Sequence, residues 1–249
     1  MSKLSIIIPV LNEVATLRRQ LPALQSLRRQ GHQVIVVDGG STDGSVQAIR
    51  GQVDLCLNSA PGRARQMNAG AAQAAGDILL FLHIDTTLPA NAAEQVVAAL
   101  ADGATCWGRF DVRLDGQHPA FRVIAGAINL RSRVTAVATG DQAIFVRRAV
   151  FEQIGGYADV PLMEDVMISK TLRSMSRPVC LRSPVLSSSR RWQQHGILTT
   201  IWLMWRLRLA FFLGASPVAL HAQYYGRHPG RHPDRHTDDR DQATREREP

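Results

Sequence analysis

Cysteine and lysine are scarce in this chain of 249 residues. The three cysteines, Cys56, Cys106 and Cys180, lie far apart and form no CxxC pair, which argues against a disulfide framework or a zinc site. Only two lysines occur, Lys3 and Lys170. This disfavours a nucleotidyltransferase, which would hold a triphosphate with a lysine-rich loop.

Long uninterrupted hydrophobic runs are also missing. The apolar run at residues 4–10 is too short for a signal peptide. The most hydrophobic segment, residues 197–213, only reaches the lower limit of a bilayer-spanning length, and Arg206 and Arg208 interrupt it. Arginines near Trp202 and Trp205 are typical of a helix at a membrane surface, although such a helix can equally pack on the domain. We therefore expect a cytoplasmic protein, with peripheral attachment to the inner face of the cell membrane as an open alternative.

Positive charge is concentrated outside the C-terminal end. The net charge is +8, yet the six arginines of residues 226–249 are balanced by six acids. A basic folded part suits phosphate-bearing ligands, anionic lipid or nucleic acid, and the charge does not choose among them. Residues 226–249 are rich in proline, histidine and arginine, which predicts a disordered charged tail.

Strands and helices alternate along the first half of the chain. The hydrophobic pattern predicts strands at residues 4–10, 33–38, 53–57 and 77–83, with helices at 13–29, 46–50, 62–75 and 89–101. This alternation is typical of a doubly wound, mostly parallel α/β sheet.

The pattern changes after residue 103 without a domain boundary. Strands are expected at 105–114, 143–147 and 179–186, and helices at 119–130, 149–154 and 163–175. We expect one domain over residues 1–220, whose sheet has a mixed edge. Its parts are a first half (1–103), a second half (104–192) and a C-terminal amphipathic helix (195–214).

The run from Val34 to Ser45 is the most informative stretch. A buried strand leads directly into Asp38 and two glycines, and strand ends are where open α/β sheets bind ligands. The glycines allow a tight turn and a close approach to a ligand. An ordinary turn capped by Asp43 is the alternative interpretation of this segment.

Acids and arginines recur at other element ends. Asp85 follows a buried strand, where a carboxylate needs a partner such as a hard cation, unless it only caps the turn before Pro89. Arg63 and Arg65 fall in the first turn of a predicted helix, where the helix dipole favours an anion; solvated side chains are the alternative.

Taken in order, these motifs carry a family resemblance. The segments SIIIPVLNE, VVDGGSTDGS, GRARQMNAG, FLHID, GDQA and MEDV resemble those of family 2 glycosyltransferases, which have the GT-A fold. The resemblance covers about residues 4–220. More narrowly, the chain is similar to a bacterial subfamily associated with arsenosugar biosynthesis.

The resemblance implies a nucleotide-sugar donor and a divalent metal, Mn²⁺ or Mg²⁺. Asp38 would contact the nucleoside, and Asp85 would match the last acid of the family's DxD metal motif. His83 stands where the first acid of that motif usually lies, and an imidazole suits Mn²⁺ better than Mg²⁺. The remaining residues implied for the donor are Pro9, Asn12, Glu13, Gly39, Arg65, Asn68, Arg191 and Trp192.

The resemblance also implies where the chemistry occurs. Asp165 matches the catalytic base, and the like charge of Glu164 beside it would help a base. Candidates for the acceptor wall are Trp107, Arg109, Gly140, Asp141 and Gln142. For Trp107 core packing is the alternative role, and for Asp141 a capped turn.

The expected reaction is an inverting transfer of a sugar to a hydroxyl or similar acceptor, with no nucleic acid partner. Two alternatives stay open. The acceptor can be a lipid, carotenoid or polyprenyl phosphate at the membrane surface. In another class of function, the chain is a non-catalytic basic module for anionic membrane or nucleic acid.

Overall fold

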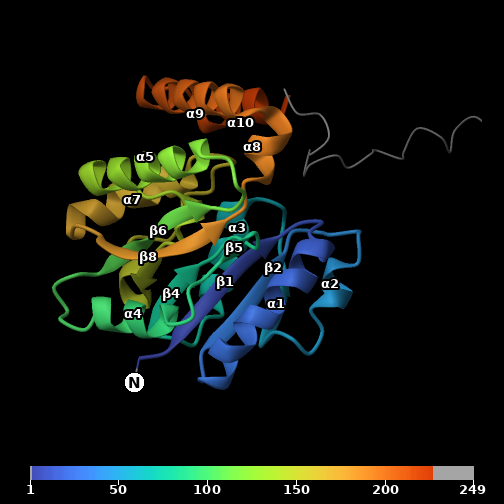
Figure 1. Ribbon diagram of the computed structural model, residues 1–249. Helices are drawn as coiled ribbons and strands as arrows, with labels where there is room; N and C mark the ends of the chain where they lie inside the picture. Colours follow the sequence, from blue (N-terminus) through green and yellow to red (C-terminus); the bar gives the residue numbers. More distant parts are fainter. Residues whose placement is uncertain (1, 227–249) are drawn as a thin grey trace, which may run out of the picture.

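The computed structural model describes residues 2–226, without the side chains of Arg191, His195 and Tyr225 (Figure 1). Residues 227–249, on which the expected disordered tail falls, lie outside the described part. The described chain folds around one eight-stranded sheet in the order β3-β2-β1-β4-β7-β6-β8-β5.

The first four strands form a parallel half-sheet. They are β1 (Leu4–Val10), β2 (Gln33–Asp38), β3 (Leu55–Asn58) and β4 (Ile78–Phe81), and their pairings β2·β3, β1·β2 and β1·β4 are all parallel. Ile6 and Ile8 of β1 belong to one core cluster, whereas Ile7 belongs to another. Alternate residues of the strand therefore meet helices on opposite faces of the sheet, which is why its sequence is apolar throughout.

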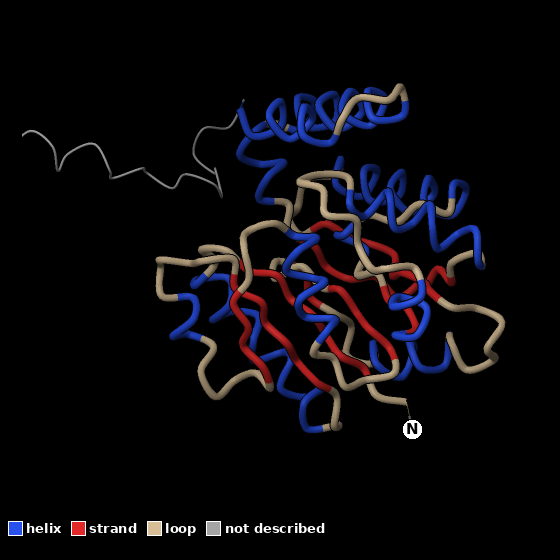
Figure 2. The backbone as a smooth tube through the Cα atoms, turned by 180° about the vertical axis from the view of Figure 1, so that it is seen from behind, coloured by secondary structure: helices blue, strands red, loops and turns tan. Residues whose placement is uncertain are grey.

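Helices cover both faces of this sheet (Figure 2). One core cluster joins the sheet to α1 (Val14–Arg29) and α4 (Ala92–Ala99). The other joins it to α3 (Arg63–Ala72), α6 (Arg148–Gln153) and α7 (Glu164–Met175). The short α2 (Ser45–Ala48) follows β2.

Helix α3 approaches the sheet closely at Gly70. A Cβ atom there would lie 2.5 Å from Ile7 Cγ2, so a larger residue would push the helix away from β1.

The second half adds the mixed edge. Strand β7 (Phe145–Arg147) runs antiparallel to both β4 and β6 (Trp107–Leu114), while β6 and β8 (Val179–Ser187) are parallel and β5 (Thr86–Thr87) is antiparallel to β8. Helix α5 (Ala120–Thr135) and the 3₁₀ turn η1 (Gly140–Gln142) lie between β6 and β7 in the chain. The predicted α/β sheet with a mixed edge is confirmed.

Three C-terminal helices form a cap over α5 and α7 (Figure 1). The helix expected at 195–214 corresponds to α9 (Ile197–Phe212), which begins after Gly196 (φ 81°). Two further helices, α8 (Arg190–His195) before it and α10 (Pro217–Gly226) after it, were not expected. Leu207 of α9 and Leu220 of α10 pack against Met163 and Val166. One face of α9 therefore packs on the domain.

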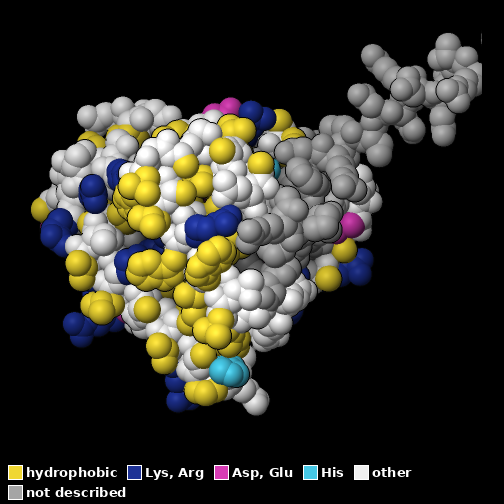
Figure 3. Space-filling view, turned by 90° about the horizontal axis from the view of Figure 1, so that it is seen from above, with side chains coloured by type: hydrophobic (Ala, Val, Ile, Leu, Met, Phe, Trp, Pro, Cys, Tyr) yellow, Lys and Arg dark blue, Asp and Glu magenta, His cyan; other side chains and the backbone are white. Residues whose placement is uncertain are grey.

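The opposite face of α9 is exposed and apolar. Trp202, Trp205 and Leu209 are 57–74% exposed. Figure 3 views this side of the molecule and shows hydrophobic side chains gathered with basic ones among them. Within residues 2–226, no helix combines the length and apolarity needed to cross a bilayer.

Candidate active site

A cavity of about 150 Å³ opens between the ends of β4 and β8, the turn η1, the start of α7 and the cap. Its walls carry eight acidic, basic or imidazole side chains: Arg63, His83, Asp85, Asp141, Glu164, Asp165, Arg190 and Arg208. Apolar residues of the cap and of the segment before α7, among them Leu162, Trp192, Met204, Leu207 and Tyr224, complete it. The structure thus brings Asp85 and Asp165 to one cavity, although 77 residues lie between the FLHID and MEDV motifs that contain them.

Asp165 is held in a fixed orientation. Its Oδ2 accepts a hydrogen bond from the backbone N–H of Gly140 (3.0 Å), and its Oδ1 accepts one from the N–H of Val166 (2.7 Å). Helix α7 begins at Glu164, so both acids occupy its first turn, where the helix dipole stabilises negative charge.

Glu164 is buried beside Asp165, with 5% of its surface exposed. Burial, followed by the charge of Asp165, raises the pKa of Glu164 to about 7, while Arg63 opposes the shift. Near neutral pH Glu164 is therefore about half protonated. The pair then holds less negative charge than two ionised carboxylates would.

This burial predicts a pH-dependent stability effect for Glu164→Gln. The pKa of Glu164 is about 7 in the folded chain, whereas its ordinary value is 4.5. Ionisation of Glu164 therefore destabilises the folded wild type as the pH rises from about 4.5 to about 7. The variant should gain about 2 kcal/mol in free energy of unfolding relative to wild type between pH 5 and pH 8. Urea denaturation at both pH values measures this gain, with the exposed Glu152→Gln as control. A difference that stays constant with pH would contradict it.

His83 packs directly against the η1 turn. Its Nδ1 lies 3.3 Å from Asp141 Oδ1, and a Cβ atom at Gly140 would lie 2.3 Å from the imidazole ring. Only glycine at position 140 leaves this space, so the GDQ segment and the FLHID turn fit together through His83.

The residues near Asp85 suit a cation that takes further ligands from a substrate. Strand β4 ends at Phe81, which leaves His83 and Asp85 in the turn before β5, both facing the cavity. In residues 2–226 no three His, Cys, Asp or Glu side chains form a complete metal cage. One or two protein donors are sufficient where substrate phosphates supply the others, as is usual for Mg²⁺.

Asp38 is buried at the end of β2 with one oxygen unsatisfied. Its Oδ2 accepts hydrogen bonds from the N–H groups of Gly40 (2.9 Å) and Ser41 (2.8 Å). Its Oδ1 is buried and has no hydrogen-bond partner among the described residues. A buried carboxylate oxygen needs a hydrogen-bond donor, and an N–H or O–H group of a ligand can supply one.

Gln66, which was not among the site residues predicted from the sequence, holds the backbone around Asp38 in place. Its Nε2 donates to the carbonyls of Val10 and Val37, both at 2.8 Å, and thereby joins the ends of β1 and β2. Gly39 lies against the same side chain, because a Cβ there would be 3.2 Å from Gln66.

The other expected donor residues of β1 lie beside this turn. Pro9 is the buried penultimate residue of β1. Asn12 (φ 53°) accepts from Thr42 N–H at 2.9 Å. Glu13 forms an ion pair with Arg190 of α8 at 3.2 Å, which connects this loop to the cavity wall.

Arg65 and Asn68 do not line the cavity. Arg65 forms an ion pair with Asp159 at 2.8 Å on the surface, and Asn68 bonds the backbone of Tyr157 in both directions. Arg63, two residues earlier, lines the cavity instead. The position in the first turn of the helix indicated an arginine at the site, but the sequence did not distinguish Arg63 from Arg65.

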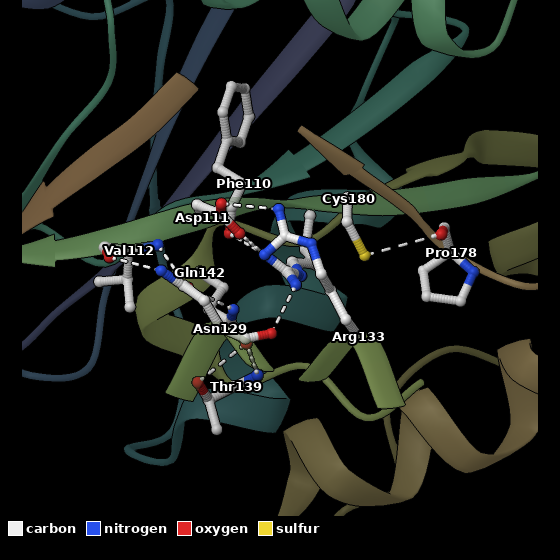
Figure 4. A network of polar contacts seen from close by, with 10 residues as sticks. Phe110, Asp111, Val112, Asn129, Arg133, Thr139, Gln142, Pro178 and Cys180 are labelled. Carbon is white, nitrogen blue, oxygen red and sulfur yellow. Dashed lines mark hydrogen bonds and ion pairs between the residues drawn. The ribbon is translucent and has the colours of Figure 1, made fainter. Parts of the chain in front are cut away.

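Three of the five expected acceptor residues, Trp107, Arg109 and Gln142, do not line the cavity. Trp107 is fully buried, and its Nε1 donates to the Ser176 carbonyl at 2.8 Å. Arg109 is also fully buried and pairs with Asp111, which in turn binds Arg133 at 2.7 Å (Figure 4). Core packing, the alternative role for Trp107, applies to both Trp107 and Arg109.

The remaining expected residues are distributed around the η1 turn and the cap. Gly140 and Asp141 line the cavity, whereas Gln142 is buried and forms the capping box with Thr139. Trp192 lines the cavity, and the side chain of Arg191 lies outside the described part.

Comparisons with known proteins agree with this geometry. Residues 5–155 match the model of the family "Glycosyl transferase family 2". The chain belongs to this family. The narrower resemblance to the arsenosugar-associated subfamily stays a prediction.

Curated relatives include the undecaprenyl-phosphate 4-deoxy-4-formamido-L-arabinose transferases of Yersinia pestis and Yersinia pseudotuberculosis. Both are 30% identical to the chain over an alignment of 162 residues, and the match covers 58% of this chain and 48% of theirs. The chain therefore spans about half the length of these relatives.

Solved structures share the fold. The mannosyltransferase PcManGT from Pyrobaculum calidifontis, in complex with GDP-Man and Mn²⁺, has a TM-score of 0.63 at 22% identity and covers 90% of this chain and 69% of its own. Glucosyl-3-phosphoglycerate synthase from Mycobacterium tuberculosis, with Mn²⁺, UDP and glucosyl-3-phosphoglycerate, has a TM-score of 0.55 at 16% identity, with coverage of 74% and 70%. The predicted GT-A fold is confirmed.

Proposed function

We propose that this protein is an inverting glycosyltransferase that moves a sugar from a nucleoside diphosphate sugar to an acceptor hydroxyl. The observation that carries the proposal is the meeting of Asp85 and the fixed Asp165 in one cavity. A non-catalytic basic module would need neither acid. Membership of glycosyl transferase family 2 and the fold shared with nucleotide-sugar enzymes support the same function.

In this proposal the donor nucleoside binds at Asp38. The unsatisfied Oδ1 would accept a hydrogen bond from the base or ribose, beside the loop of Pro9, Asn12, Glu13 and Gly39. Arg63 replaces Arg65 as the candidate for the diphosphate, because it lines the cavity. Trp192 and Arg191 stay candidates for the same region.

Asp85 would hold a divalent metal, with His83 beside it. The chemistry that such a metal supplies is stabilisation of the negative charge that grows on the departing diphosphate. Asp165 would accept the proton of the acceptor hydroxyl as its oxygen attacks the anomeric carbon. A single displacement of this kind inverts the anomeric centre.

A second candidate acceptor is a lipid phosphate at the membrane surface. The exposed apolar face of α9, with Trp202 and Trp205, supports this alternative together with the undecaprenyl-phosphate enzymes among the relatives. Peripheral association with the inner face of the membrane would then bring the cavity to its acceptor.

A thermal-shift screen of UDP, GDP and dTDP with Mn²⁺ tests the donor site. We expect one nucleotide to raise the Tm of the wild type, and Asp38→Asn to lower its affinity about tenfold or more, because an amide cannot replace both acceptor oxygens. The surface variant Asp159→Asn is the matched control. No Tm shift with any nucleotide, together with no turnover of a panel of nucleotide sugars, would contradict the proposed function.

A further inference from the structure

Two arginines from different helices lie within electrostatic range of Asp165. Arg131 lies on α5 and Arg208 on α9, and Arg208 lines the cavity. Burial is the main cause that lowers the pKa of each guanidinium, and repulsion from Arg208 is the next cause for Arg131, whose pKa falls to about 10. Two positive charges are therefore close together in a partly buried position.

The guanidinium of Arg131 lacks the partners that neighbouring arginines have. Nε and Nη2 of Arg131 are buried without a hydrogen-bond acceptor among the described residues. By contrast, Arg133 of the same helix binds Asp111, and Arg190 of the cavity wall binds Glu13. Buried N–H groups of a charged side chain are costly when unmatched, so their retention here indicates a ligand that supplies acceptor oxygens.

The pair lies on the Asp165 side of the cavity. The carboxylates that act on both guanidiniums are Asp165 and Asp141, rather than Asp38 or Asp85 of the donor side. The cavity wall that includes Arg208 also carries Leu162, Met204, Leu207 and Tyr224, which give it an apolar part. An anionic group bound here would thus belong to the acceptor.

We propose that Arg208, with Arg131 behind it, binds a phosphate group of the acceptor, so that the enzyme selects phosphate monoesters. Planar guanidinium N–H groups match phosphate oxygens in pairs, and two of them offset the added negative charge near Asp165. This assignment rests on the proposed function, because it takes Asp165 to mark the acceptor side.

Titration of the full chain with inorganic phosphate tests the site. Isothermal calorimetry is done with the best nucleoside diphosphate and Mn²⁺ at saturation, so that the donor phosphate positions are already filled. Arg208→Gln should weaken phosphate binding about tenfold or more, and Arg131→Gln combined with it should weaken binding further. Arg206→Gln is the matched control, since Arg206 stacks on Trp202 and bonds Gln223 on the exposed face of the same helix.

The outcomes separate this site from the donor site and from a structural role. Loss of phosphate affinity with unchanged nucleotide affinity and unchanged Tm supports the proposal. The proposal is overturned if the double variant binds phosphate as tightly as the wild type, or if it loses nucleotide affinity as much as phosphate affinity. A fall in kcat without a loss of phosphate affinity also overturns it, because the two arginines would then only orient Asp165. If the double variant fails to fold, Arg208→Lys replaces it, since a lysine keeps the charge and loses the paired N–H geometry. If no nucleotide binds, the proposed function fails, and the same titration without nucleotide still measures the arginine site.

Competition assays then identify the source of the phosphate. Glycerol phosphate in solution and a short prenyl phosphate in neutral detergent micelles are each added to the phosphate titration. Competition by either ester supports the site and assigns its class, soluble or lipid. Competition by neither overturns the proposed selection of phosphate monoesters.

Discussion

Replacement of Asp165 by asparagine should lower sugar transfer to a hydroxyl acceptor by about 10²- to 10⁴-fold, the usual contribution of a general base. The amide keeps the size of the side chain and can still accept from the N–H of Gly140. It cannot take the proton of the acceptor. Nucleotide affinity should stay within about twofold, because the donor nucleoside is assigned to Asp38 in another part of the site.

Two measurements make this expectation specific. Transfer rates are compared at saturating donor, and nucleotide affinity is measured by thermal shift on the same preparations. Asp159→Asn, which removes a carboxylate from the exposed pair with Arg65, serves as the control for loss of charge. A loss in Asp165→Asn below about tenfold would contradict a general base and would indicate an acceptor oxygen that is already ionised, as in a phosphate monoester.

The first two strands could be predicted because almost all of their residues are buried. The bounds of β1 and β2 agree with the predicted ranges 4–10 and 33–38. Every residue of β1 is buried, and so is every residue of β2 except Gln33. Apolar runs bounded by turn residues fix such strands locally. The strand that leads into the FLHID motif was predicted at residues 77–83 but spans only Ile78–Phe81. It ends early because His83 leaves the strand and packs against Gly140, 57 residues later in the sequence.

The contacts that distinguish similar side chains could not be predicted. Arg63 and Arg65 are two positions apart, so they point to opposite sides of α3, and only the packing of the helix determines which one meets the cavity. Arg109 looks like a surface residue of a strand, yet it is buried. Asp111 and the carbonyl of Asn129 on α5 accept hydrogen bonds from its Nη1 and Nη2 atoms, while its Nε has no partner among the described residues. The cap helix α10 was missed because it is held by tertiary contacts of Leu220 and Tyr224 rather than by a strong local pattern.

Loss of the Asp85 carboxylate should abolish most of the metal-stimulated activity. Asp85→Asn keeps the turn between β4 and β5 but removes the negative charge that we assign to the cation. Since the proposed role of that cation is to stabilise the leaving diphosphate, we expect transfer at limiting Mn²⁺ to fall about a hundredfold or more. Removal of metal from the wild type with EDTA should give a loss of similar size, and EDTA should have little further effect on the variant.

The dependence of rate on metal concentration identifies the ligand. If Asp85 binds the cation, Asp85→Asn should require a much higher Mn²⁺ concentration than the wild type to reach half of its maximal rate. His83→Gln is the informative comparison, because the imidazole is already 3.3 Å from Asp141 and an amide preserves the volume against Gly140. A change in the preference between Mn²⁺ and Mg²⁺ in His83→Gln would make the imidazole a second ligand, since nitrogen donors favour Mn²⁺. An Asp85→Asn enzyme with the wild-type metal dependence would contradict the assignment of Asp85 as a metal ligand. The charge of the leaving diphosphate would then be stabilised by the arginines of the cavity, such as Arg63 at the start of α3.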